Sequence, residues 1–479
     1  MKKYIISSLV GFLFVGCTAD DINDDSNVAY TTLPTTLLTY SQKELSDYVN
    51  TCSVNENNFR LTMQYWQETT YINESIYDFT NRNVSNTIFI NNYVNVLNNL
   101  TKAKEIINAY APEPSEVNEW PAIKQNQLAI IDIMQVYTYQ NLVDTFGNVP
   151  YSQSNQLATI INPVYDDAST IYTNLISRLD TDIQNLDAST TSFKPAGADL
   201  YYNGSVSKWK TFGSSLMLKL GITLADSNPS LAQSTVTKAI GYGVMTSSAD
   251  NCILQYLGSS PNWSPVYENV KASNRNDFVG GKTLIDYMNT NADPRISKYF
   301  KPVGTTGNYI GQAIGSPATF SNFSAPGTFA YTTTTPGILL NYTEVAFYLT
   351  EASARWGIGG TPAVNYANAI TSSFTDWDMA SSAAAYIVAH PYNATNWKQS
   401  VGEQAWVAMY NQPLTSWNFW RRLDYPALSA PPAASPITTV PVRMMYPISE
   451  STTNGVNWAA AGTAIGGDKL STKIFWDKN

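Results

Sequence analysis

The chain is poor in the side chains that most often carry out chemistry. Its 479 residues include a single histidine, His390, and three cysteines, Cys17, Cys52 and Cys252. One histidine excludes metal sites that need a pair, and any Ser-His-Asp triad would depend on His390 alone. Cys52 and Cys252 could pair in an oxidising compartment, but two cysteines do not make a disulfide scaffold. We favour two separate buried thiols.

Charge is scarce as well. Charged residues make up 14% of the chain, against about a quarter in typical soluble domains. The net charge is -9 and no basic cluster is present. This argues against a nucleic-acid partner, because phosphate binding needs concentrated Lys and Arg. Hydrophobic residues reach 44%, so the chain is not disordered, and its length allows two or three domains or one large helical body.

Catalytic motifs are also lacking. The sequence contains no nucleophile elbow and no phosphate-cradling loop. A glycoside hydrolase needs only two carboxylates across a cleft, which the acidic residues could supply. Glu344 and Glu351 share one face of a predicted helix, but we favour a solvated face or an ion pair with Arg355 for them. We therefore predict that the protein is not an enzyme and name no catalytic residue.

The start of the chain has the order of a secretory signal. Lys2 and Lys3 precede an apolar run over 4–15, which is too short to cross a bilayer, and Gly16 and Cys17 follow. A cysteine after a small residue fits a bacterial lipoprotein signal, although Phe14 stands where Leu is usual. We predict a signal peptide over 1–16 and acylation of Cys17, with two or more acyl chains giving lasting anchorage.

An acidic tether over 17–30 is predicted to follow. Asp20, Asp21, Asp24 and Asp25 would be repelled by an anionic lipid surface, so the segment is not itself a membrane-binding tail. It is either a solvated linker or resembles the acidic export tag of lipoproteins in Bacteroidetes-type bacteria. The second interpretation predicts an outer-membrane lipoprotein that faces the cell exterior.

Helical periodicity dominates two blocks, about 31–243 and about 341–479. In the first block the predicted helices cover 85–107, 117–144, 165–186, 205–226 and 230–241. The second block begins with a helix from Asn341 to about Gly357 and another from Pro362. Between the blocks, about 244–340 is rich in Gly, Pro, Ser, Thr and aromatics; such a long loop-rich stretch is uncommon unless it has a function.

The helix pairs resemble tetratricopeptide-type hairpins, although no clean repeat of about 34 residues is present. The predicted fold is therefore mainly α: one body over 31–479 built from tetratricopeptide-like hairpins with a long loop-rich insertion.

Several stretches together resemble the SusD/RagB family of nutrient-binding outer-membrane lipoproteins, in particular its second, SusD-like subgroup. They follow the family's order and cover nearly the whole mature chain. The stretches are Val143-Asp-Thr-Phe-Gly-Asn-Val-Pro-Tyr151, Lys208-Trp-Lys210 with Leu216–Leu220, Tyr267-Glu-Asn269, Arg275–Phe278, Asp293-Pro-Arg295, Tyr348-Leu-Thr-Glu-Ala352, Trp417–Arg422 with Tyr425-Pro426, and Pro441–Arg443 with Tyr446-Pro447. Thr350 stands where the family usually has Ala.

Most of these motif residues are interpreted as scaffold. Phe146-Gly147 and Pro150 shape a helix exit. The pairs Arg275/Asp277 and Asp293/Arg295 are expected to form caps or buried ion pairs. Arg421 and Arg422 are expected to stack among the rings of Trp417, Phe419 and Trp420.

Aromatic residues in irregular segments are the ligand-binding candidates. A flat ring can hold the C–H face of a sugar while Asn, Asp and Arg bond its hydroxyls, and a rigid ring loses little entropy on binding. Such rings could equally pack loops onto the helical body. The candidates are Tyr71, Tyr77, Trp263, Tyr267, Tyr309, Phe320 and Phe323.

The resemblance implies a function in nutrient uptake. It predicts that the protein captures an oligosaccharide, or less favourably a peptide, and delivers it to a SusC-type TonB-dependent transporter. An anchored glycoside hydrolase and a surface adhesin are the alternatives from other classes. No cofactor is expected, and whether Ca²⁺ binds among the loop Asp and Asn residues stays open.

Overall fold

The computed structural model of the chain describes residues 32–79 and 82–478. The predicted signal peptide, the lipidation site Cys17 and the acidic tether lie outside these residues. Within the described ranges, no helix is both long and apolar enough to span a bilayer.

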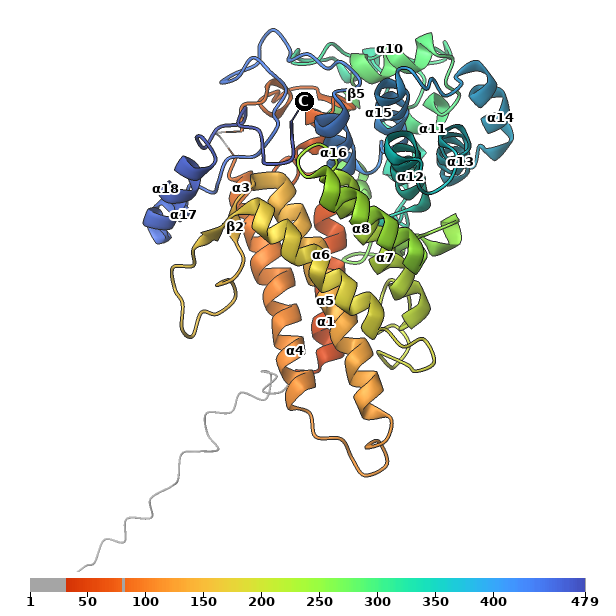
Figure 1. Cartoon of the computed structure of the whole chain (residues 1–479). Helices are drawn as coiled ribbons and strands as arrows, with labels where there is room; N and C mark the ends of the chain where they lie inside the picture. The colour runs from red at the N-terminus through yellow and green to blue at the C-terminus, as the bar shows by residue number, and fades with distance from the viewer. Residues whose placement is uncertain (1–31, 80–81, 479) are drawn as a thin grey trace, which may run out of the picture.

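Long helices form the first half of the fold and pack in sequence order, α4 on α5, α5 on α6, α6 on α7 and α7 on α8, with α1 against α4 (Figure 1). Their bounds are α1 Pro34–Asn50, α4 Asn99–Ala109, α5 Trp120–Phe146, α6 Ala168–Asn185, α7 Val206–Thr223 and α8 Pro229–Tyr242. In α5, the apolar positions Ile130, Ile133, Met134 and Tyr137 are all buried, as their helical spacing predicts. Four of the predicted helices are thus confirmed to within a few residues.

The predicted helix over 85–107 is one helical run with an irregular middle. It comprises α3 Val84–Phe89, the π-helical stretch η3 Ile90–Asn98 and α4. The Asn side chains here bond to helix carbonyls: Asn92 Nδ2 donates to Ile88 O at 2.8 Å and Asn99 Nδ2 to Asn95 O at 2.9 Å. Asn side chains that compete for backbone groups favour local departures from α-helix.

The second helical block follows the insertion. Its helices are α12 Tyr342–Trp356, α13 Pro362–Asp376, α14 Ala380–Ala389, α15 Trp397–Ala408 and α16 Pro413–Leu423, with the short α17 Glu450–Thr453 and α18 Gly455–Ala464 near the C-terminus. Asn341 caps α12 by accepting from Glu344 N at 3.0 Å, and Gly357 ends it with φ 68°. Both predicted bounds of this helix are confirmed.

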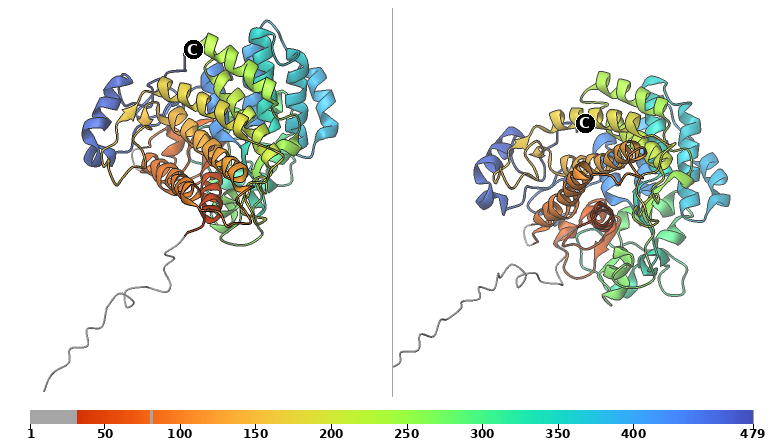
Figure 2. Two further views of the ribbon diagram at one scale, coloured as in Figure 1. Left: turned by 60° about the horizontal axis from the view of Figure 1, so that its bottom comes forward. Right: turned by 90° about the horizontal axis from the view of Figure 1, so that it is seen from below.

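Two short antiparallel pairs hold the loop-rich insertion: β1 Trp66–Glu68 with β5 Phe278–Gly280, and β4 Cys252–Leu254 with β6 Gly337–Leu340. The other pair in the described residues, β2 Val149–Pro150 with β3 Tyr165–Asp166, lies in the first helical block. The remaining short helices and helical turns are α2 Phe59–Thr62, η2 Glu74–Ile76, η4 Ser248–Asp250, α9 Pro265–Tyr267, η5 Glu268–Ala272, α10 Lys282–Thr290, α11 Ile296–Tyr299, η6 Phe320–Asn322 and η7 Thr328–Tyr331. In the view from below, α1 lies between α4–α5 and this insertion (Figure 2).

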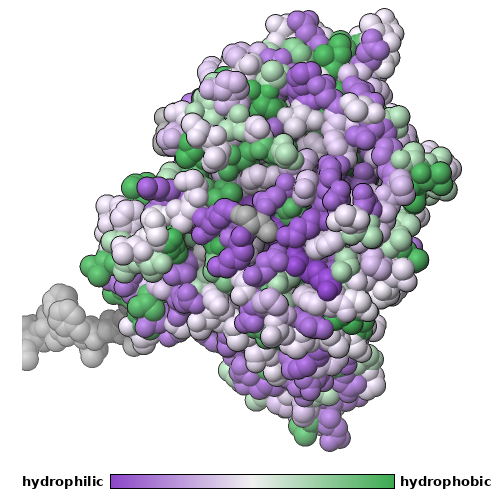
Figure 3. Space-filling model, turned by 45° about the horizontal axis from the view of Figure 1, so that its top comes forward, coloured by the Kyte–Doolittle hydropathy of each residue, from purple (hydrophilic) through white to green (hydrophobic). Residues whose placement is uncertain are grey.

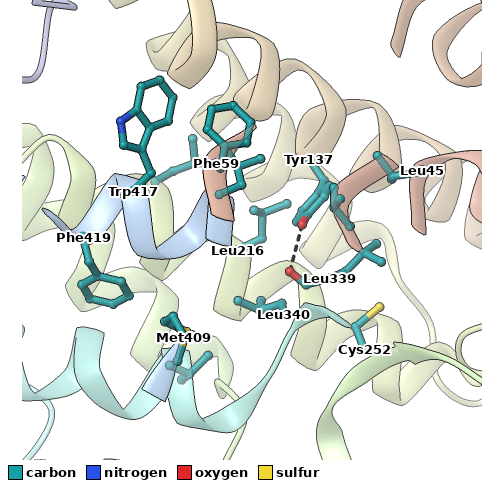
Figure 4. Close-up of a cluster of buried hydrophobic side chains, with 14 of the residues drawn as sticks. Leu45, Phe59, Tyr137, Leu216, Cys252, Leu339, Leu340, Met409, Trp417 and Phe419 are labelled. Carbon is teal, nitrogen blue, oxygen red and sulfur yellow. Dashed lines mark hydrogen bonds between the residues drawn. The ribbon is translucent and has the colours of Figure 1, made fainter. Parts of the chain in front are cut away.

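One continuous core joins the hairpins to the insertion. Figure 4 shows Leu45 of α1, Leu216 of α7 and Trp417 of α16 in the same cluster. The Tyr137 hydroxyl donates to Leu339 O at 2.8 Å, so α5 is bonded directly to β6. A buried hydroxyl that finds a partner avoids the cost of desolvation.

Buried ion pairs account for several of the motif residues. Glu344 pairs with Lys219 at 2.9 Å, and Glu351 pairs with Arg355 at 2.8 Å and also with Arg422. Both glutamates are 0% exposed, so the expectation of a solvated face was wrong, whereas the ion pair with Arg355 is confirmed.

The structure also shows how the predicted ion pairs, the arginine–ring contact and the two cysteines are arranged. Asp293 and Arg295 form a fully buried pair at 2.6 Å, while the Arg275–Asp277 pair at 2.9 Å lies at the surface. The Arg421 guanidinium lies 3.5 Å from the centre of the Trp417 ring. Cys52 and Cys252 are buried as free thiols.

The contact between α7 and α8 depends on Gly221. A Cβ at this position would lie 2.9 Å from Val236 Cγ2 and 3.1 Å from Thr235 Cγ2. We expect Gly221→Ala to destabilise the fold by about 1–3 kcal/mol through overpacking, measured by urea unfolding. Gly241→Ala in α8 is the matched control, because its Cβ would meet nothing within 4 Å; it should be neutral or stabilise by up to about 1 kcal/mol. Equal effects of the two changes would contradict the packing argument.

Candidate ligand-binding site

A cleft of about 730 Å³ opens where α1 ends beside the insertion. We call it the α1–α9 cleft. It is bounded by the C-terminal part of α1, the loop after it, the helical run α3–η3, and α9 with η5. Its lining residues are Glu44, Asp47, Tyr48, Thr51, Glu56, Thr87, Ile90, Asn91, Asn95, Trp263, Pro265, Glu268, Asn269, Ala272 and Ser273.

Trp263 is the aromatic platform of this cleft. It is half-buried and its ring packs against Tyr267, with centroids 5.2 Å apart and planes at 60°. Pro265 occupies the first turn of α9, where its fixed φ suits a helix start. The short helix thereby places Tyr267 behind Trp263, and the supported ring can receive an apolar ligand face.

Amide side chains line the same cleft as Trp263. Asn95 Nδ2 donates to Glu44 Oε2 at 3.0 Å, and Asn269 Nδ2 donates to Pro265 O at 2.9 Å. These bonds fix the orientation of each amide, because its Nδ2 atom is the one that bonds to the protein. The arrangement combines a flat ring with hydrogen-bonding side chains, which suits a ligand with hydroxyl groups.

The cleft carries negative charge. Four carboxylates line it, and no Lys or Arg is among the described lining residues. Asp47 pairs with Lys43 and accepts from the Tyr256 hydroxyl at 2.7 Å. Burial raises the pKa values of Glu44 and Glu56. Negative charge in the lining disfavours anionic ligands. In the described part of the chain, no group of three or more acidic, Cys or His residues is placed to hold a metal ion.

A second hollow of about 430 Å³, the Trp377 pocket, is lined in part by η7, which also contacts α9 and η5. It is lined by Ser297, Lys298, Thr328, Phe329, Thr335, Pro336, Ile338, Asn341, Asp376, Trp377, Asp378, Ala408, Asn411 and Gln412. The Trp377 ring packs against Tyr299 at 4.7 Å and Phe329 at 5.4 Å between centroids. None of the sequence-predicted candidates belongs to this pocket.

The seven predicted residues are not brought together in one site. Trp263 lines the α1–α9 cleft with Tyr267 behind it. Tyr71 is 68% exposed, and Tyr77 is 0% exposed and accepts a hydrogen bond from Gln64 at 3.0 Å. Because its ring is enclosed by the core, Tyr77 is left out of the proposed site. The remaining candidates lie half-buried outside both hollows: Tyr309, Phe320 and Phe323.

The loop that carries Tyr71 is nevertheless bonded to the insertion. Thr69 N donates to Asp277 O and Ala318 N donates to Thr69 O, each at 2.8 Å. The loop therefore lies beside the segment that leads to Phe320. Hydrophilic side chains dominate the middle of the molecular face drawn in Figure 3.

Two buried carboxylates hold this loop in place. Glu68 is 5% exposed and Glu74 is 0% exposed. Glu68 Oε2 accepts from Ser75 N and Ser75 Oγ, each at 2.9 Å, and Glu74 pairs with Arg82. Burial, followed by the neighbouring Glu74, raises the pKa of Glu68 to about 8.

The helical body carries a polar cleft, and aromatic rings that pack against each other lie at its edge. This is the architecture of a ligand-binding protein. The chain belongs to the second SusD-like family: residues 25–447 match that family, which is described as starch-binding and associating with the outer membrane. The resemblance found in the sequence is thereby confirmed.

Solved structures show the same fold. A protein described as chitin-binding is 25% identical, with a TM-score of 0.82 over 93% of this chain and 100% of that chain. A SusD homologue from Bacteroides uniformis is 23% identical, with a TM-score of 0.79 over 92% and 99%. A chitin-binding SusD homologue from Flavobacterium johnsoniae is 22% identical, with a TM-score of 0.77 over 93% and 98%. No curated protein matches the chain. The predicted mainly helical SusD-like fold is confirmed.

Because the pKa of Glu68 is raised, the stability of the folded protein should depend on pH. The folded protein keeps a proton that the unfolded chain releases above about pH 4.5, so this group's contribution to stability falls as pH rises toward 8. Gln imitates the protonated acid. We expect Glu68→Gln to flatten the dependence of the melting temperature on pH between 5 and 8, with a gain on the order of 1 kcal/mol at pH 8. The exposed Glu105→Gln should leave the wild-type pH profile unchanged, and an unchanged profile for Glu68→Gln would refute the assignment.

Proposed function

We propose that the protein captures an oligosaccharide in the α1–α9 cleft at the cell surface. The observation that carries the proposal is the Trp263 ring, which packs against Tyr267 and lines the same cleft as the amides of Asn91, Asn95 and Asn269. A pyranose offers C–H groups to the ring and hydroxyls to the amides and carboxylates. The family's starch-binding description and the chitin-binding name of a structural relative support a glycan as the ligand.

Delivery is the second part of the proposal. The protein is anchored in the outer membrane by acyl chains on Cys17, faces the exterior, and passes its ligand to a SusC-type TonB-dependent transporter. The family description supports association with the outer membrane. The proposed mechanism is binding without chemistry, which the binding descriptions of the family and of the structural relative support.

Other classes of function make different predictions. An oligopeptide-binding lid would bind mixed peptides and ignore glycans. An anchored glycoside hydrolase would release reducing ends from a polysaccharide, and a surface adhesin would show neither a transporter partner nor a saturable soluble ligand.

Loss of the platform should abolish most of the affinity. We expect Trp263→Ala to weaken binding of a recognised oligosaccharide by about tenfold or more, about 1.4 kcal/mol, as measured by isothermal titration calorimetry after a glycan screen. Trp120→Ala is the control, because Trp120 is half-buried at the start of α5, away from the cleft. Unchanged affinity in Trp263→Ala would exclude this cleft as the capture site.

Anchorage and partnership can be tested on the full-length protein in native outer membranes. We expect affinity purification in mild detergent to recover a stoichiometric large β-barrel transporter. Cys17→Ala should leave the membrane fraction because the acyl anchor is lost. An abundant, lipidated protein that purifies alone would contradict the delivery role while leaving glycan capture to be judged by the Trp263 variant.

A further inference from the structure

We propose that the Trp377 pocket is a second binding site, separate from the α1–α9 cleft, that takes a sugar bearing an N-acetamido group. The proposal stands on the pocket's own side chains and does not require the cleft to bind. It is carried by two adjacent amides, Asn411 and Gln412, whose orientations are fixed by charged partners.

Both amide side chains are buried and are bonded to buried charged groups. Asn411 is 8% exposed and Gln412 is 6% exposed. Arg60 Nη2 donates to Asn411 Oδ1 at 3.2 Å, and Gln412 Nε2 donates to Glu344 Oε2 at 3.2 Å. A guanidinium can only donate and a carboxylate can only accept, so neither amide can flip without losing its bond.

The outer atoms of the two amides are therefore determined. Asn411 must turn Nδ2, a donor, and Gln412 must turn Oε1, an acceptor, away from these buried partners. Neither atom bonds to another described residue, and neither is among the fully enclosed unpartnered atoms. Since both residues line the pocket, it presents one donor and one acceptor that the protein leaves unused.

An acetamido group complements this pair. Its carbonyl accepts from Asn411 Nδ2 and its N–H donates to Gln412 Oε1. Its methyl finds apolar surface in the pocket wall, which includes Pro336, Ile338 and Ala408. A hydroxyl could satisfy the polar atoms but would leave the apolar wall without a partner, so the pocket distinguishes acetylated sugars from unmodified ones.

Trp377 supplies the surface for the sugar ring. It is half-buried and is held by Tyr299 and Phe329, so little side-chain freedom remains to be lost on binding. Asp376 lies beside it and accepts from Thr343 Oγ1 at 2.7 Å and Asn341 Nδ2 at 3.2 Å through the same oxygen, Oδ2. Its other oxygen is available as an acceptor for a ring hydroxyl.

Asn411→Asp is the most discriminating variant. It keeps the oxygen that Arg60 uses and replaces only the donor Nδ2, so the fold should survive. We would titrate N,N′-diacetylchitobiose, chitobiose and cellobiose into the full chain carrying Trp263→Ala, which removes the platform of the other cleft. We expect the diacetylated sugar to bind about tenfold tighter than cellobiose, and Asn411→Asp to remove that difference. Asn322→Asp, an exposed position on the insertion, controls for the added charge.

Several outcomes would overturn the proposal. Equal binding of the three disaccharides, or no saturable binding at millimolar concentrations, overturns it. So does an Asn411→Asp variant that melts like its parent and keeps the preference for the acetylated sugar. Acetylalanine amide supplies the acetamide without a sugar ring; if it binds as tightly as the disaccharide, the sugar assignment fails. Loss of affinity for all sugars in Trp377→Leu, with the melting temperature retained, supports the ring contact, because leucine offers no flat ring.

Discussion

Two buried carboxylates on α12 join this helix to α7 and α16 and hold one side chain of the Trp377 pocket. Glu344 pairs with Lys219 of α7 and accepts from Gln412, and Glu351 pairs with Arg422 of α16. A buried charge left without its partner costs about 3–5 kcal/mol, so these positions fix how α7, α12 and α16 meet. The same constraint orients the Gln412 amide, and thereby links the packing of the core to the chemistry offered in the Trp377 pocket.

The sequence predicts best those helices whose apolar residues follow the helical period. Predictions over 117–144 and 205–226 match α5 and α7 to within a few residues. α1 was not predicted, because it buries polar residues among its apolar ones: Ser41, Gln42, Ser46 and Asn50. α16 was not predicted either; its polar side chains, among them Asn418, Arg421 and Arg422, are buried together with its apolar ones.

The candidate site shows a similar limit. Trp263 and Tyr267 could be chosen from residue type and their place in a loop-rich segment. Whether an aromatic ring is enclosed depends on tertiary packing, so the burial of Tyr77 could not be predicted. Asn95 belongs to a helical stretch and Trp377 follows the end of a helix, and neither carries a local signal for ligand binding. The family resemblance identifies the class of protein but does not align these side chains.

Both hollows are assembled from distant parts of the chain. The α1–α9 cleft brings residues 44–56 beside residues 263–273, and the Trp377 pocket brings residues 297–341 beside residues 376–412. The helical hairpins, in contrast, join neighbours in the sequence. Because long loops close slowly and at an entropic cost, we expect the hairpins to form first and the face that meets the ligand to assemble last. A newly made chain would then be folded in its scaffold before its two hollows are complete.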